Sequence, residues 1–159
     1  MTRTFSVEPY TPNDHAACLR IFDSNTPRFF TREERSAFAA FLDALPGPFW
    51  VVHGQPDGDV IGCGGVSVTD EGRSAWLRWG MVAAEHHRQG IGQRLLETRL
   101  RWIATQPMVE TIRVATTGAV SPFFARMGFE VVQVIEGYYG PGMARYDLEL
   151  RRRPRERPR

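Results

Sequence analysis

The sequence of 159 residues contains no lysine, so its 20 strongly basic residues are all arginines. P-loop nucleotide sites end in Gly-Lys-Ser/Thr and need that lysine at the terminal phosphates, so its absence excludes P-loop chemistry. Cysteine is almost as scarce: Cys18 and Cys63 lie far apart and form no CxxC pattern. Because His15 and His53 show no ligand spacing with them, the sequence predicts neither a disulfide framework nor a metal site.

Long apolar runs are also missing. No stretch approaches the roughly 20 apolar residues of a membrane helix, and the segment from Met1 to Tyr10 has no apolar run suited to a signal peptide. The run from Gly64 to Thr69 lacks the final glycine of a nucleophile elbow, which argues against a serine hydrolase. We therefore expect a cytoplasmic protein that is not associated with a membrane.

The composition is that of an ordinary globular domain, with 42% hydrophobic and 24% charged residues. Charge is distributed unevenly, because residues 151–159 hold six arginines against Glu156 alone and leave residues 1–150 slightly acidic. An arginine-rich end can bind nucleic acid or another polyanion. Its prolines favour the simpler interpretation of a disordered, solubilising tail. We predict one domain over residues 1–150, a disordered tail over 151–159, and no nucleic-acid partner.

Apolar periodicity and turn residues divide the domain into strands and helices. Capping boxes at Thr11–Asp14 and Thr31–Glu34 predict two helices after the first strand, and further helices follow the fourth and fifth strands. The expected strands are Phe5–Glu8, Phe49–His53, Val60–Thr69, Ser74–Val82, Thr111–Thr116, Phe129–Ile135 and Ala144–Leu150.

A glycine-rich turn, His86 to Gln93, joins the fourth strand to the helix that starts near Ile91. Unpaired N–H groups and the positive end of the helix dipole meet at such a turn, which predicts an anion site suited to a pyrophosphate. A dinucleotide fingerprint would need a third glycine where Leu95 stands, so an ordinary Rossmann site is disfavoured.

The turn resembles the coenzyme A loop of the GCN5-related N-acetyltransferases (GNAT), which reads Arg or Gln, two residues, Gly, one residue, then Gly or Ala. His87 stands in the first place of that pattern and departs from it, while Arg88 can supply the positive charge. A second family landmark, an aromatic pair on a short helix that ends in Gly-Phe, is similar to Phe123–Phe129. The order of elements resembles the family from Phe5 to Leu150.

This resemblance implies a single-domain GNAT fold of the α/β (α+β) class, with a mixed, mostly antiparallel, twisted sheet of about seven strands and about four flanking helices. It implies acetyl-CoA as cosubstrate, although a longer acyl group is left open, and transfer to a primary amine by direct attack in a ternary complex. The backbone N–H of Val82 or Met81 would face the thioester oxygen. The residues implied to bind the cofactor are Met81, Val82, His87, Arg88, Gln89, Gly90, Ile91, Gly92, Gln93, Thr117 and Phe124.

The chain departs from the family at its acid and base. Phe124 occupies the place where family members often have the tyrosine that protonates the thiolate, and no acidic residue lies on the strand from Trp76 to Val82. Tyr138 and Tyr139 are the candidate acids, with a structural role in the wall of the pocket as the alternative, and no base is assigned. Gly80 is a place either for a strand bulge or for a packing gap beneath Trp79.

Acceptor residues are the least constrained. By family topology, Phe29, Phe30 and Trp79 predict an aromatic pocket for a small-molecule amine, with ordinary core packing as the alternative. Two other functions stay open: a protein N-terminal or lysine acetyltransferase, and a catalytically inactive acyl-CoA-binding module. The resemblance also leaves a homodimer open.

Overall fold

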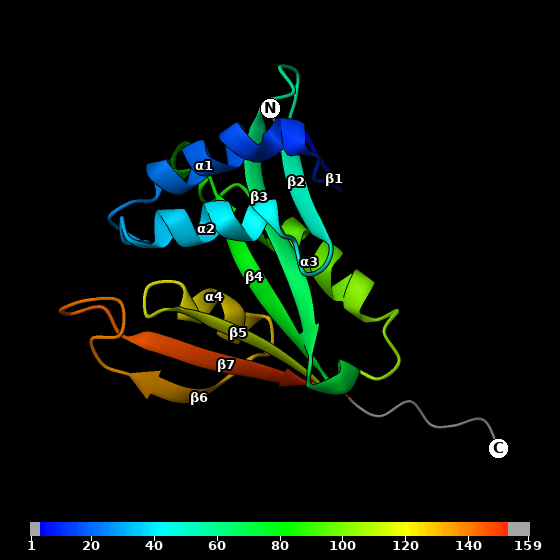
Figure 1. Cartoon of the computed structure of the whole chain (residues 1–159), viewed down its shortest axis with the longest axis vertical. Helices are drawn as coiled ribbons and strands as arrows, with labels where there is room; N and C mark the ends of the chain where they lie inside the picture. The colour runs from blue at the N-terminus through cyan, green and yellow to red at the C-terminus, as the bar shows by residue number, and fades with distance from the viewer. Residues whose placement is uncertain (1–3, 153–159) are drawn as a thin grey trace. The chain divides into compact units, whose positions relative to one another are not determined.

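Seven strands and four α-helices make up the part of the chain, residues 4–152, that the computed structural model describes (Figure 1). Short 3₁₀ turns η1, η2 and η3 cover Pro12–Asp14, Asp70–Gly72 and Ala84–His86. The helices are α1 His15–Ser24, α2 Glu34–Asp43, α3 Ile91–Ile103 and α4 Ser121–Arg126. The strands are β1 Phe5–Pro9, β2 Phe49–Gly54, β3 Val60–Thr69, β4 Ser74–Val82, β5 Thr111–Thr117, β6 Glu130–Ile135 and β7 Arg145–Arg151.

These bounds confirm the predicted elements, and those of β3 and β4 agree residue for residue. The capping box at Thr11 forms, and Asp14 Oδ2 accepts the Thr11 N–H at 3.0 Å. At the second box Glu34 Oε1 accepts the Thr31 N–H at 3.0 Å, but the N-cap of α2 is Glu33, without a side-chain cap hydrogen bond. Gly128 has φ +98°, the left-handed conformation expected at the end of α4.

The strands form one seven-stranded sheet in the order β1-β2-β3-β4-β5-β7-β6. Its β1–β2, β2–β3, β5–β7 and β6–β7 pairs are antiparallel, and β4 pairs with β5 in parallel through Ser74–Trp76 and Thr111–Arg113. The predicted mixed, mostly antiparallel sheet with four helices is therefore confirmed. By its contacts the chain divides into two compact units, and β4 contributes to both.

The first unit, residues 1–67 and 78–102, is a sheet segment with helices on both faces. On one face α1 and α2 lie side by side and pack Phe22 and Phe38, both 0% exposed, against Phe49 and Cys63 (Figure 1). A separate cluster contains Ile91 and Leu95 of α3 with Val52, Ile61 and Val82. Apolar burial on both faces holds the end of β4 and the start of α3 in fixed register, and the glycine turn lies between them.

The second unit, residues 68–77 and 103–159, contains β5, β6, β7 and α4. Its buried side chains include Ile112 and Val114 of β5, Leu148 of β7, and Phe124 and Phe129 at α4. The strand β6 is at the edge of the sheet, and Val131, Val132 and Val134 on it are exposed.

The predicted tail falls mostly outside the described residues. Of its two described members, Arg151 closes β7, and Arg152 donates from Nη1 to the carbonyls of Ile103 at 3.1 Å and Gln106 at 2.9 Å. The expectation of disorder over residues 153–159 therefore stays a prediction. Among the described helices, none is long and apolar enough to span a membrane.

Candidate functional site

The predicted phosphate turn is an exposed loop in the first unit. It leaves β4 at Val82, passes through the η3 turn, and enters α3 at Ile91. Arg88 and Gly90 both adopt the left-handed conformation, with φ +64° and +81°. A Cβ atom on Gly90 would have no neighbour within 4 Å, so this side of the loop is open to solvent.

The loop presents unpaired backbone donors. The Arg94 N–H donates to the Gly90 carbonyl at 3.1 Å and begins the hydrogen-bond ladder of α3, so the N–H groups of Ile91, Gly92 and Gln93 precede that ladder. They stand at the positive end of the helix dipole beside the exposed Arg88. Such an arrangement can bind a phosphate or pyrophosphate through the backbone with one guanidinium added.

Two side chains anchor the loop to the rest of the first unit. The Val82 carbonyl lies 2.9 Å from the Nδ2 of Asn25 and 2.9 Å from the Nε2 of His87. Asn25 Nδ2 also donates to the Ile21 carbonyl at 2.9 Å, and its side chain is 3% exposed. The His87 bond requires the tautomer that carries its proton on Nε2. His87, predicted from its motif position, therefore holds the loop through its ring, and Asn25, which sequence reasoning missed, ties α1 to β4.

Replacing Asn25 with aspartate is expected to lower the free energy of unfolding by about 3 kcal/mol. The carboxylate cannot donate, so the Ile21 and Val82 carbonyls would lose a shared donor and face a buried negative charge. Urea denaturation of Asn25→Asp, with the exposed Asn13→Asp as control, measures the effect. A loss at Asn25 no larger than the control's would contradict this role for the amide.

The backbone of β4 is irregular just before the loop. Trp79 has φ +50°, a conformation that bulky residues rarely adopt. Consecutive side chains accordingly point to the same helix: the Arg78 guanidinium lies 5.5 Å from the centre of the Phe41 ring, and the Trp79 ring lies 6.4 Å from it. The left-handed residue is therefore Trp79, one position before the Gly80 that the sequence suggested.

The predicted acceptor residues occupy different environments. Phe30 stacks on Phe22 with ring centres 4.9 Å apart, and Trp79 lies 5.0 Å from Phe38, so both belong to the aromatic packing under α1 and α2. Phe29 instead contacts the phosphate loop, with its ring edge-on to His87 at 5.6 Å. Of the three, Phe29 is the one that the structure brings to the loop.

Two predicted cofactor residues lie in the second unit. Thr117 ends β5, and its buried hydroxyl has no hydrogen-bond partner among residues 4–152. Phe124 is 6% exposed and packs edge-on against Phe123 and Phe129. Phe124 is therefore a core residue of α4, which explains how the chain accommodates phenylalanine there, while the Thr117 hydroxyl is buried and unpaired among the described residues.

The two candidate acids, Tyr138 and Tyr139, lie in the loop between β6 and β7. Their rings meet edge-on with centres 5.0 Å apart, and Tyr138 is 53% exposed. The Arg145 guanidinium lies 4.8 Å from the Tyr138 ring centre and donates from Nε to Asp147 at 2.7 Å. Burial lowers the pKa of Arg145, but its hydrogen bonds to Asp147 and Tyr138 outweigh burial and raise the pKa. The loop therefore carries a permanent cation beside Tyr138.

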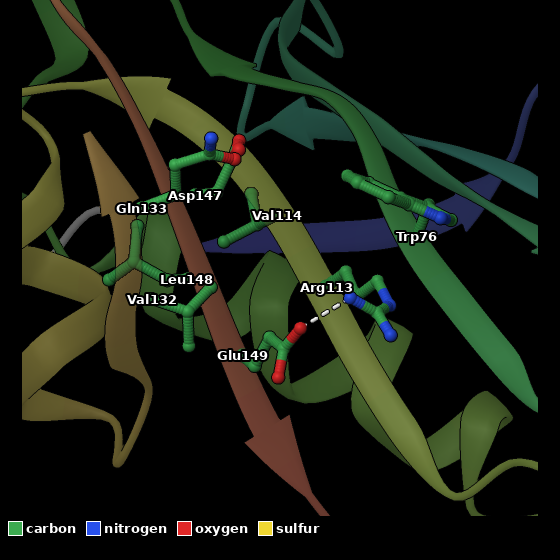
Figure 2. Close-up of a pocket in the computed structure, with 8 residues that line it drawn as sticks. All are labelled: Trp76, Arg113, Val114, Val132, Gln133, Asp147, Leu148 and Glu149. Atoms are coloured by element: carbon green, nitrogen blue, oxygen red, sulfur yellow. Dashed lines mark hydrogen bonds and ion pairs between the residues drawn. The ribbon is translucent and has the colours of Figure 1, made fainter. Parts of the chain in front are cut away.

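A hollow of about 300 Å³ lies on the sheet of the second unit (Figure 2). The carboxylates of Asp147 and Glu149 are paired with Arg145 and Arg113 respectively, so the charges of the hollow are largely neutralised. Figure 2 shows the Arg113–Glu149 pair bridging β5 and β7. The residues that line the hollow are Trp76, Arg113, Val114, Val132, Gln133, Asp147, Leu148 and Glu149.

Comparison with known proteins identifies the family. A model of the acetyltransferase (GNAT) domain matches residues 46–131, just over half of the chain, and this match includes β4, the phosphate loop and α4. A sequence search of curated proteins found no significant match.

Solved structures share the fold over almost the whole chain. A GNAT-family protein from Desulfovibrio desulfuricans has 23% identity, a TM-score of 0.75, and coverage of 93% of this chain and 99% of its own. The ribosomal-protein-S18-alanine N-acetyltransferase from Escherichia coli has 16% identity, a TM-score of 0.76, and coverage of 93% and 94%. An aminoglycoside 6′-N-acetyltransferase complexed with coenzyme A has 12% identity, a TM-score of 0.76, and coverage of 96% and 99%. The chain therefore belongs to the GNAT family of acetyl-CoA-dependent N-acetyltransferases.

Proposed function

We propose that this chain transfers an acetyl group from acetyl-CoA to the primary amine of a small molecule, by direct attack of the amine on the thioester. The observation that carries the proposal is the exposed loop at the start of α3, where Gly90 is left-handed and backbone donors precede the helical ladder. A pyrophosphate fits this loop because the loop offers convergent N–H groups and needs no side-chain donor.

The residues proposed to hold the donor are those of the loop and of the end of β4. The N–H groups of Ile91, Gly92 and Gln93 would bind phosphate oxygens, with Arg88 adding positive charge. The N–H of Met81 or Val82 would polarise the thioester carbonyl, in a strand whose end is fixed by Asn25. Acetyl-CoA itself supplies the activated acetyl group as a thioester.

The amine needs to be neutral when it attacks, and its proton leaves through water or a base. We assign no base. Tyr138 remains the better placed of the two candidate acids, because its ring is exposed and lies beside the Arg145 cation.

The choice of a small amine rests on the aromatic segment before α2. Phe29 is half-buried against His87 of the loop, with the Arg28 guanidinium 4.9 Å from its ring centre. An aromatic ring beside the donor loop favours an acceptor with an apolar or aromatic body. The structural relatives include enzymes named for an aminoglycoside and for the alanine of a ribosomal protein, so a protein acceptor is the alternative.

Acetyl-CoA at about 100 times its dissociation constant is expected to stabilise the fold by about 2.7 kcal/mol, a rise of several degrees in Tm. Thermal unfolding with and without acetyl-CoA measures this, and CoA release over a panel of small amines then tests transfer. Binding without CoA release on any amine or protein extract would favour the inactive acyl-CoA-binding module. Label from acetyl-CoA found only on macromolecules would favour the protein acceptor, and no rise in Tm would remove the proposed function.

A further inference from the structure

Arg99 in α3 is a buried cation that has no counter-ion among residues 4–152. Its side chain faces the sheet, with the residue 3% exposed. Its Nε has no hydrogen-bond partner, and within residues 4–152 its guanidinium takes part in no ion pair. Burial lowers the pKa of Arg99 to about 10, so the guanidinium is still charged at neutral pH. A charge buried in this way is costly unless a ligand or partner compensates it.

Two glycines make room for this guanidinium. A Cβ on Gly80 of β4 would lie 2.7 Å from Nη2 and 2.9 Å from Nη1 of Arg99, and a Cβ on Gly64 of β3 would lie 3.3 Å from its Cζ. The terminal nitrogens therefore occupy the place that a side chain at position 80 would take. At the left-handed Trp79 the ring lies against Phe41 of α2, whereas a Cβ on the next residue, Gly80, would meet Arg99 of α3.

The nearest titratable group does not neutralise the guanidinium. Among the described residues, Cys63 is the group that would raise the pKa of Arg99, and it would do so only as a thiolate. Burial raises the pKa of the Cys63 thiol well above its usual value, with a smaller contribution from the neighbouring Cys18, so Cys63 is uncharged. The positive charge beside Gly80 therefore has no negative partner in the first unit.

Gly80 is also the exposed part of the end of β4. Its backbone is exposed to solvent, whereas Met81 after it is 6% exposed. In the proposed function, acetyl-CoA is anchored by its phosphates at the start of α3. The Gly80 backbone belongs to the same unit and lies on β4, the strand that leads directly into the phosphate loop. The position of Phe124 is where GNAT family members often have a proton donor. Phe124 itself is buried and apolar, so it cannot protonate or stabilise a leaving thiolate.

Resting on the proposed function, we infer that Arg99 supplies the positive charge that stabilises the thiolate of CoA at Gly80 as the acetyl group leaves. In this step the amine nitrogen forms a bond to the acetyl carbon, the carbon–sulfur bond breaks, and its electron pair stays on sulfur. The proton of the amine goes to water. Arg99 keeps its own proton throughout and acts by charge.

The experiment compares binding of CoA with binding of desulfo-CoA, which has the same phosphates and pantetheine but no thiol, at pH 7 and pH 9. If the site prefers the thiolate, the ratio of the CoA affinity to the desulfo-CoA affinity is expected to rise with pH. The rise is about tenfold for each unit by which the bound site lowers the pKa of the CoA thiol. Calorimetric titration of the wild-type protein should show this rise, and Arg99→Met should abolish it. Arg101→Met, an exposed arginine of the same helix, is the matched control and should retain it.

The outcomes separate this inference from the proposed function. Wild-type protein that binds neither ligand would overturn the proposed function. Wild-type protein whose CoA to desulfo-CoA ratio does not change with pH, or Arg99→Met that keeps the wild-type change, would overturn the role of Arg99 alone. Arg99→Gln keeps a polar side chain without the charge and replaces the methionine variant if that variant does not fold. In Arg99→Gln, too, the CoA to desulfo-CoA ratio should no longer change with pH.

Discussion

Replacing Gly90 with leucine is expected to weaken acetyl-CoA binding by at least about 100-fold, the equivalent of about 2.7 kcal/mol. Two physical effects combine. Gly90 has φ +81°, which an L-residue adopts at a cost of about 1 to 2 kcal/mol. Its missing side chain would also point into the open space over the backbone donors, where a phosphate has to approach. Calorimetric titration of Gly90→Leu with acetyl-CoA measures the loss.

The matched control is Gly58→Leu in the turn between β2 and β3. Gly58 has φ +76°, and a Cβ there would also meet nothing within 4 Å. The two variants therefore carry the same backbone strain and the same open surroundings, and they should lose similar stability. They differ in their distance along the chain from the loop, so only Gly90→Leu should lose acetyl-CoA. Equal affinities in the two variants would remove the loop as the phosphate site.

Local features of the sequence were sufficient to predict the loop. The left-handed turn at Gly90 and the start of α3 at Ile91 depend on residues within one or two turns of each other, so their spacing carries the information. The strands β3 and β4 were equally readable, because apolar runs between turn residues define their ends. The family resemblance then supplied the mixed, mostly antiparallel character of the sheet, which spacing alone does not determine.

Long-range partners could not be predicted. Asn25 looks like an ordinary helix-ending residue, and its bond to the Val82 carbonyl joins residues 57 positions apart. Arg99 interrupted the apolar stripe of α3, but only the two facing glycines show that a buried guanidinium fits there. The sequence left Gly80 open as a strand bulge or as a packing gap, and the structure gives the left-handed conformation to Trp79, whose ring packs against Phe38 at 5.0 Å.

Arg99 also links stability to the proposed chemistry. Because an unpaired buried cation opposes folding, Arg99→Met should be at least as stable as the wild-type protein even though it loses thiolate stabilisation. A residue kept at such a cost to stability is typical of sites where function and stability conflict. A purely structural role would predict the opposite sign, namely a loss of stability with no change in the ligand preference.

The second effect is expected at Gly80, where alanine should lower the free energy of unfolding by about 1 kcal/mol, the low end for an overpacked site, because the atoms that must move are the end of a flexible side chain. The added methyl group would overlap both terminal nitrogens of Arg99, at 2.7 and 2.9 Å, and the buried guanidinium would have to move. Because Gly80 is not left-handed, backbone strain does not contribute. The same displacement should remove the preference for the CoA thiolate that Arg99 is inferred to provide.

A double-mutant cycle isolates this contact. In an Arg99→Met background the terminal nitrogens that the new methyl group would overlap are absent, so Gly80→Ala should cost less there, with a coupling of about 0.5 kcal/mol. Gly62→Ala is the control, because a Cβ at Gly62 would contact Val52 and Ile91 at 3.3 and 3.4 Å instead of the guanidinium. Its cost should therefore be the same in both backgrounds. Urea denaturation of the four proteins measures the coupling. Equal costs of Gly80→Ala in both backgrounds would mean that the guanidinium does not occupy the space beside Gly80, and the inferred role of Arg99 would lose its geometric basis.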